Sequence, residues 1–321
     1  PTHLKLMGER AIHHDYHDEG LDFEHLARLV DMPGSDNQCS PRNAEWDIRF
    51  TQGWQDRYVL EWAHQSVMLD FTKSICPEKP FFDSEWHGLS APRWRDFHTH
   101  AEYVRAVLWL ASTHGMSAMN VWVWNRLADG AVDYRADFIG CTMTQPIQLD
   151  AFGRTMMELN AHGDAVRALV PKRRYYLVYY CRDAAIQDPA YSEHMMEVYE
   201  ALKLLNVPVG FATPSTLASV SKADQTLVVP PTPFISNTDL EGLSAFADSR
   251  GKVILVEPSK SFAKNELGAV RRTDPGFTPY ATVDLAGTFD MADALAAALA
   301  TRKPARPVAV EVTDPEGNPA Y

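Results

Sequence analysis

Residues 79–87 have the sequence Lys79-Pro80-Phe81-Phe82-Asp83-Ser84-Glu85-Trp86-His87, an apolar segment that ends in a glutamate. Its short length and aromatic residues predict a buried β-strand. Apolar residues recur at helical spacing on both sides of it, at about 55–75 and about 97–114. A strand between two helices is typical of parallel βα units, so we expect an α/β fold.

The same alternation extends from residue 1 to about 168. Further strands are expected at Leu4–Met7, Leu29–Met32 and Ala118–Trp124, further helices at Leu21–Leu29 and about 150–168, and a turn at Pro33–Asn37. About four βα units fit here, half of the eight in a (β/α)8 TIM barrel. We therefore predict that residues 1–168 form the C-terminal half of such a barrel and that its first half lies upstream.

A basic joint at 169–173 precedes a second series of strands and helices. Strands are expected at Tyr175–Tyr180, Val207–Phe211, Leu227–Val229 and Val253–Val256, and helices at Met195–Leu205, Pro214–Val220 and Leu240–Ala247. This pattern predicts a small doubly wound α/β domain at 172–270. Beyond residue 270 the alternation of strands and helices weakens, so the first part of 271–321 is expected to be a connector.

The composition restricts the class of protein. The formal net charge of −12 argues against a nucleic-acid partner and against anionic membrane surfaces. No run of 18 apolar residues indicates a membrane span. The cysteines Cys39, Cys76, Cys141 and Cys181 are far apart and lack metal-ligand spacing, so we expect free thiols. The compartment stays open, with the cytoplasm favoured.

A metal site is the tempting interpretation of residues 13–18, where His13, His14, His17, Asp15 and Asp18 cluster. Mixed clusters of this kind in loops are more often solvated. We therefore expect neither a metal nor another cofactor.

Glu85 is the strongest catalytic candidate. The C-terminal ends of barrel strands hold the active site, and a retaining glycosidase needs a nucleophilic carboxylate about 5 Å from an acid/base carboxylate. Neighbouring donors such as His87 would keep Glu85 ionised. Asp83, two residues earlier, is expected on the same face as Glu85. The alternative for Glu85 is a surface salt bridge.

Two further groups of residues follow expected strands. Trp122 and Trp124 end one strand, just before Arg126, and could form an aromatic floor for a sugar ring or pack in the core. The turn Asp36-Asn37 could bind sugar hydroxyls or form a plain Asx turn. In the second domain no G-x-S-x-G motif follows a strand, so this domain is expected to be noncatalytic.

The stretch from Asp36-Asn37 through 79–87 to Met119–Arg126 resembles the C-terminal barrel half of the family-42 β-galactosidases. Residues 174–260 are similar to that family's trimerisation domain, a flavodoxin- or amidotransferase-like module. The tail at 306–321 resembles the start of its small β domain. Gln38 and Cys39 stand where the family tends to have Tyr-Pro, and the family's zinc-binding cysteine cluster has no counterpart.

The resemblance implies a retaining β-galactosidase-like glycoside hydrolase that acts by double displacement. It assigns Glu85 as the nucleophile on the seventh strand, and Trp124 as the sugar-facing Trp of the eighth. The acid/base Glu would lie upstream, so residues 1–321 alone are expected to be inactive. The implied partners are a galactoside or oligosaccharide and further copies of the chain, as a trimer. Two alternatives remain, a retaining glycosidase for another sugar and a noncatalytic assembly module with a degenerate barrel.

Overall fold

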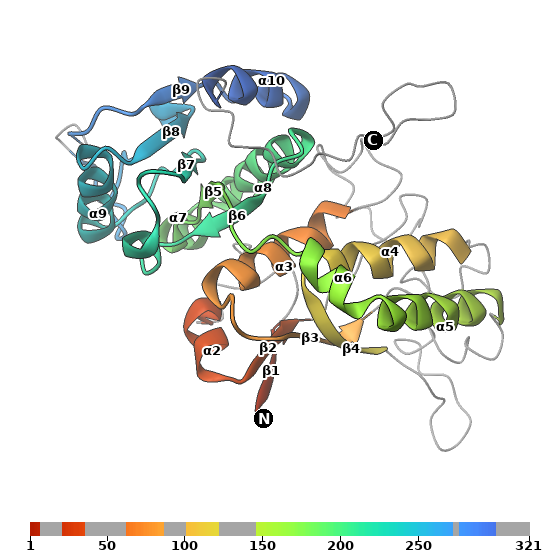
Figure 1. Cartoon of the computed structure of the whole chain (residues 1–321). Coiled ribbons are helices and arrows are strands. Elements are labelled where there is room, and N and C mark those ends of the chain that lie inside the picture. Colours follow the sequence, from red (N-terminus) through yellow and green to blue (C-terminus); the bar gives the residue numbers. More distant parts are fainter. Residues whose placement is uncertain (7–20, 36–61, 87–100, 122–145, 272–275, 300–321) are drawn as a thin grey trace.

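The computed structural model describes residues 1–6, 21–35, 62–86, 101–121, 146–271 and 276–299. These residues form two parallel β-sheets, each with helices packed on it (Figure 1). The expected α/β class is therefore confirmed. Within the described ranges, no helix is long and apolar enough to cross a membrane.

Among the described residues, the first sheet contains four strands in sequence order. They are β1 (His3–Leu6), β2 (Met32–Ser35), β3 (Phe81–Trp86) and β4 (Met116–Val121), and every adjacent pair is parallel. The helices of this part are α2 (Phe23–Leu29), α3 (Trp62–Ile75), α4 (Ala101–Thr113), α5 (Pro146–Ala161) and α6 (Gly163–Leu169). Sequential parallel strands joined by helices are consistent with part of a (β/α)8 barrel.

Two local expectations for this part were wrong. Pro33, Gly34 and Ser35 belong to strand β2 and not to a turn. A Cβ atom on Gly34 would lie 1.7 Å from the carbonyl oxygen of Phe82, so the glycine permits a close approach of β2 to β3. The single helix expected at about 150–168 is two helices, α5 and α6, which are separated at His162.

The part of the second sheet that the structure describes has five parallel strands in the order β6-β5-β7-β8-β9. Their bounds are β5 Tyr176–Tyr179, β6 Val209–Ala212, β7 Thr226–Val229, β8 Lys252–Val256 and β9 Ala281–Val283. Since β5 comes first in the chain and lies between β6 and β7, the connections run outward in both directions, as in a doubly wound sheet. The sheet extends past residue 270, because β9 pairs with β8.

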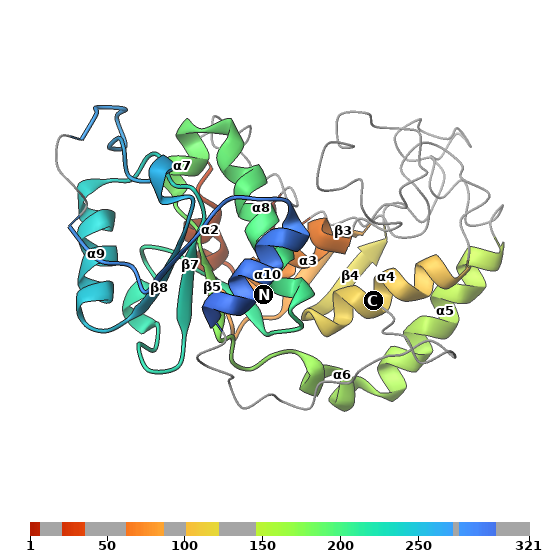
Figure 2. The same ribbon diagram turned by 90° about the horizontal axis from the view of Figure 1, so that it is seen from above.

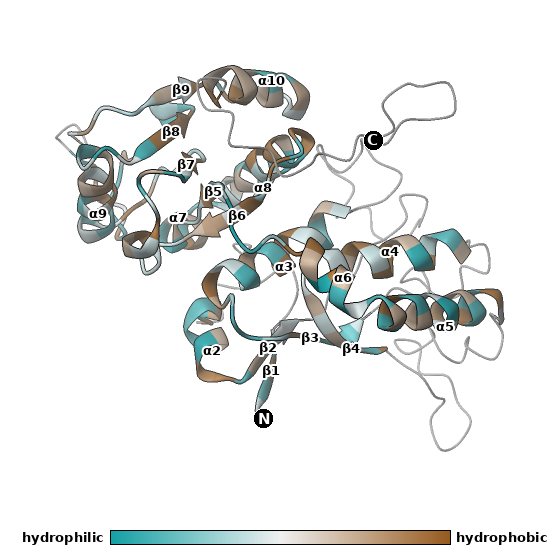
Figure 3. Ribbon diagram, in the orientation of Figure 1, coloured by the Kyte–Doolittle hydropathy of each residue, from teal (hydrophilic) through white to brown (hydrophobic). Residues whose placement is uncertain are grey.

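Helices cover both faces of the second sheet. Helices α8 (Pro189–Leu204) and α10 (Thr288–Leu299) lie on one side, and α9 (Asn237–Asp248) lies on the other (Figure 2). A short helix, α7 (Arg182–Gln187), follows β5 and had not been expected. The strand β6 is apolar and fully buried, whereas α5 and α9 carry mixed hydrophobic and hydrophilic residues (Figure 3). Among the described cysteines, Cys76 and Cys181 are free, as expected, and the structure also places both in the interior.

Helix α3 lies between the two sheets and belongs to both cores. It packs against β2 and β3 of the first sheet and against β6 of the second. Eleven of its fourteen residues are buried, among them His64, Gln65 and Asp70. The expected buried stripe along one side of this helix is therefore too narrow, because a helix sandwiched between two sheets is buried all round.

Asp70, on α3, is the most enclosed charge at this junction, with a side chain only 2% exposed. Four groups in the described ranges contact its carboxylate: Tyr199 Oη at 2.8 Å, His114 Nδ1 and Lys203 Nζ each at 3.2 Å, and Arg174 Nη2 at 3.3 Å. His114 follows α4 of the first part, whereas the other three belong to the second. One carboxylate thus connects both parts of the chain.

The charge state of Asp70 follows from these partners. Burial alone would raise the pKa of the carboxyl, but Lys203, His114 and Arg174 outweigh that effect and hold the pKa well below its usual range. The arginine reaches Asp70 past Gly210 of β6, where a Cβ atom would lie 2.1 Å from Arg174 Cδ. Asp70 is therefore an ionised, fully partnered carboxylate.

Replacing Asp70 by alanine should lower the free energy of unfolding by about 3–5 kcal/mol, because Lys203 and Arg174 would lose their buried counter-ion. Urea denaturation of the full chain would measure this loss. The matched control is Asp150→Ala, which removes an exposed i,i+4 pair with Arg154 and should leave stability nearly unchanged. Equal stability of both variants would contradict the role assigned to Asp70.

His64 should make stability depend on pH. Burial lowers its pKa from 6.5 to about 4, so between these values the unfolded chain binds a proton that the folded chain does not. The free energy of unfolding should therefore fall as the pH drops from 6.5 towards 4, and His64 should account for about 3 kcal/mol of this decrease.

The test is urea denaturation of His64→Gln at several pH values. In this variant the free energy of unfolding should depend much less steeply on pH. Part of the dependence should remain, because burial also lowers the pKa of His114. Substitution of the exposed His25 by Gln is the control and should leave the slope intact. An unchanged slope in His64→Gln would show that the imidazole is not buried in its neutral form.

Candidate active site at the end of strand β3

Glu85 lies at the C-terminal end of β3, on the edge of the first sheet where all four parallel strands end. Its side chain is 14% exposed. The neighbouring Trp86 is fully buried in a core with Val104 and Leu108 of α4, and its ring lies 5.9 Å from that of Phe152 on α5. Trp86 thus anchors the strand end to the helices.

Asp83 and Glu85 do not share a face, contrary to expectation. The register of β3 against β4 shifts between Asp83 and Trp86, so the simple alternation of side chains breaks there. Asp83 is fully buried, as Phe81 and Trp86 are, whereas Glu85 is partly exposed. The Asp83 carboxylate accepts a hydrogen bond from the backbone N–H of Glu85 at 3.3 Å and so supports the irregular backbone.

Lys5 of β1 forms an ion pair with the Glu85 carboxylate. The two residues lie on strands separated by β2, and Lys5 is in register with Gly34, which has no side chain. The lysine is 34% exposed and the glutamate 14%, so water screens the pair only in part. An adjacent ammonium group favours the ionised form of a carboxylate. The site therefore contains a partly exposed carboxylate that is paired with an ammonium group.

The beginning of β3 is fixed by Lys79. Its ammonium group donates to three carbonyl oxygens at the end of α2, those of Ala27 (3.3 Å), Arg28 (2.7 Å) and Val30 (2.6 Å). A cation at this position satisfies carbonyls that a helix end leaves without partners. Both ends of β3 are thus attached to neighbouring helices, which holds Glu85 in place.

The other expected site residues lie outside the described residues. They are Asp36, Asn37, His87, Trp122, Trp124 and Arg126. The His/Asp cluster at 13–18 also lies outside them, and no group of three possible metal ligands occurs within the described ranges. The roles expected of these site residues therefore stay predictions.

Sequence reasoning missed Lys5. It had been placed in a strand but given no function, because its partner is 80 residues away in the chain. A charged residue between Leu4 and Leu6 was the available signal, since a lysine inside an apolar strand requires a partner or water.

Comparison with known proteins was made by sequence and by structure. No model of a protein family and no curated protein matches the sequence. An exo-carrageenase of glycoside hydrolase family 42 from Bacteroides ovatus has a similar structure, with a TM-score of 0.76 and 27% identity over 94% of this chain.

Two β-galactosidases show the same similarity at lower identity. The enzyme from the haloarchaeon Halorubrum lacusprofundi has a TM-score of 0.59 and 15% identity over 85% of the chain. A family-42 enzyme from G. stearothermophilus has a TM-score of 0.55 and 14% identity over 85%. The chain spans 40%, 40% and 39% of the lengths of the carrageenase and these two enzymes. The expected relationship to the family-42 enzymes is thus confirmed.

Proposed function

We propose that the chain is the C-terminal part of a retaining glycoside hydrolase that releases terminal β-galactosides, with Glu85 as its nucleophile. The observation that carries the proposal is the Glu85 carboxylate at the C-terminal edge of the parallel sheet, paired with Lys5. Active sites of barrel enzymes lie at this edge. The structural relationship to family-42 enzymes over most of the chain adds independent support.

The reaction proceeds by double displacement. The Glu85 carboxylate attacks the anomeric carbon while an acid/base carboxyl group from upstream of residue 1 protonates the leaving oxygen. The same upstream group then removes a proton from water, which hydrolyses the glycosyl ester and frees Glu85. Lys5 pairs its ammonium group with the Glu85 carboxylate in the free enzyme. The α/β domain takes no part in the chemistry and mediates assembly into a trimer.

The second candidate is a retaining glycosidase that acts on carrageenan-derived oligosaccharides. The exo-carrageenase shares 27% identity with the chain, against 14–15% for the two β-galactosidases. A panel of nitrophenyl glycosides and carrageenan oligosaccharides, tested on the protein with a complete barrel, separates the two specificities. Turnover of neither class would favour the noncatalytic assembly module.

Replacing Glu85 by alanine in the complete-barrel protein should lower kcat/KM by at least a thousandfold, because the covalent intermediate can no longer form. Added azide should restore turnover and give a glycosyl azide of inverted anomeric configuration, since a small anion then fills the place of the carboxylate. NMR analysis of the product identifies the anomer.

The control is Glu102→Ala, which removes an exposed glutamate of α4 and should retain full activity. Wild-type hydrolysis by Glu85→Ala would eliminate the nucleophile assignment. An inactive variant that azide does not rescue, in a protein that still binds sugar, would also count against it.

Replacing Lys5 by methionine should move the acidic limb of the kcat/KM profile to higher pH, because the Glu85 carboxylate loses the adjacent positive charge. Lys5→Arg keeps the charge and should keep the limb near its original position. Identical pH profiles for the methionine variant and the unchanged enzyme would show that Lys5 does not act on the ionisation of Glu85.

A further inference from the structure

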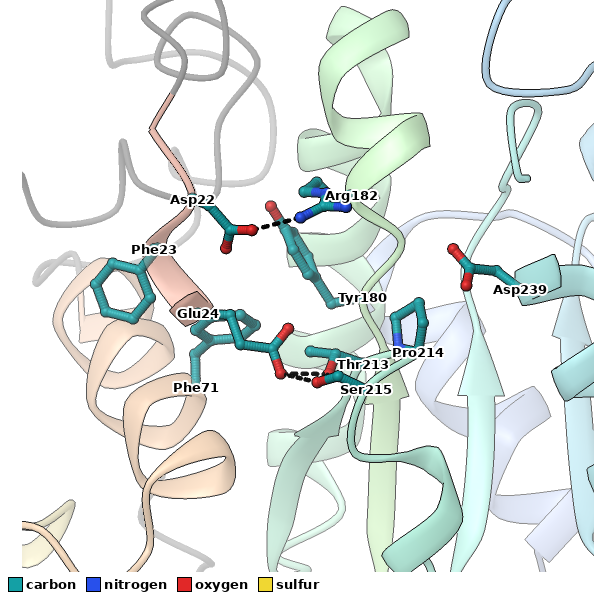
Figure 4. A pocket seen from close by; sticks show the side chains of 10 residues that line it. All are labelled: Asp22, Phe23, Glu24, Phe71, Tyr180, Arg182, Thr213, Pro214, Ser215 and Asp239. Atoms are coloured by element: carbon teal, nitrogen blue, oxygen red, sulfur yellow. Dashed lines mark hydrogen bonds and ion pairs between the residues drawn. The ribbon is translucent and has the colours of Figure 1, made fainter. Parts of the chain in front are cut away.

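A cavity of about 330 Å³ lies between helix α2 and the second sheet (Figure 4). Its lining contains charged, hydroxyl and aromatic side chains: Asp22, Phe23, Glu24, Phe71, Tyr180, Arg182, Thr213, Pro214, Ser215 and Asp239. The volume is within the range of small-molecule sites. Glu85 is not part of this lining, so the cavity is separate from the candidate active site.

The cavity occupies the position where open α/β sheets bind ligands. Tyr180 and Arg182 follow strand β5, Thr213 and Ser215 follow β6, and Asp239 lies in the first turn of α9 after β7. The carboxyl ends of strands around the first strand of a doubly wound sheet form such a crevice. Here helix α2 of the first part forms its other wall.

Two of the three carboxylates in the wall are already paired. Asp22 forms an ion pair with Arg182, and Glu24 accepts hydrogen bonds from Thr213 (2.8 Å) and Ser215. Glu24 also pairs with Arg28 at 2.6 Å. These contacts fix the polar wall and neutralise most of its charge, so hydrogen-bonding capacity dominates there.

Asp239 differs from the other two carboxylates. It forms no ion pair with any residue that the structure describes, and in Figure 4 it stands across the cavity from the paired groups. Burial, opposed by a hydrogen bond from Ser236 and assisted by Asp183, raises the pKa of its carboxyl above the usual value. Its oxygens are half-buried acceptors that a ligand can use.

The remaining wall is aromatic and buried. The rings of Phe71 and Tyr180 meet edge-on, with their centroids 5.0 Å apart. The centroid of the Phe23 ring lies 5.7 Å from that of Phe71, and these two rings are tilted. All three side chains are at most 5% exposed. The cavity therefore combines a fixed aromatic side with polar groups on the opposite sides.

The mixture of polar groups restricts the chemistry of the ligand. A phosphate or carboxylate has only acceptors and would meet three carboxylates. A protonated amine has only donors, so it could bind Asp239 but could not accept a hydrogen bond from Arg182. A hydroxyl group both donates and accepts, and the C–H face of a sugar fits an aromatic wall. We propose that this cavity is a noncatalytic binding site for a neutral monosaccharide unit, with Asp239 accepting from its hydroxyls.

Ligand-observed NMR and calorimetry on the full chain test this site with galactose, glucose and mannose. At least one of these sugars should bind, and Asp239→Ala should weaken that binding by tenfold or more. The matched control is Glu241→Ala, which removes an exposed carboxylate two residues further along the same helix and should leave binding unchanged. Glu85→Gln should also leave it unchanged, which separates this site from the active site.

Three results would overturn the proposal. The first is no binding of any of the three sugars at tens of millimolar. The second is equal sugar binding by Asp239→Ala and the unchanged chain, when circular dichroism shows that both proteins are folded. The third is binding of inorganic phosphate or methylammonium alone. None of these results bears on Glu85, so the proposed catalytic function stands or falls by its own test.

Discussion

The ion cluster around Asp70 is the contact on which the arrangement of the two parts depends. A lone buried carboxylate would be strongly unfavourable, and only well-placed partners offset its desolvation. Here the partners come from the end of α4 and from the second α/β unit, on segments up to 133 residues away in sequence. The position of α3 is therefore specified by charge as well as by apolar packing.

Much of the fold could be predicted from periodicity, and two of the exceptions, strand β2 and helix α3, share one cause. Strand β3 and helix α9 have apolar residues at the spacing of their class and were found near their expected positions. Strand β2 was mistaken for a turn because its glycine serves a contact with β3 that the local sequence does not reveal. The all-round burial of α3 was missed because it results from a second sheet, more than 100 residues later in the chain.

The candidate sites, like the fold, could be predicted from the sequence only in part. The position of Glu85 at the end of a strand could be predicted, because a glutamate at the end of an apolar segment is visible in the sequence itself. Its partner Lys5 could not, because only the neighbouring strands bring the two together. The cavity beside α2 could not be predicted from the sequence either, because its lining residues are spread over the chain from Asp22 to Asp239.

The shared core has a consequence for how the molecule can be divided. Phe23, Val67 and Phe71 of the first part belong to the same hydrophobic cluster as Val178 and Phe211 of the second. Severing the chain in the joint at 169–173 would leave each piece with a large apolar face and an unmatched set of charges. Evolution could exchange or lose the α/β unit only together with changes in α2 and α3, so both parts should be inherited as one block.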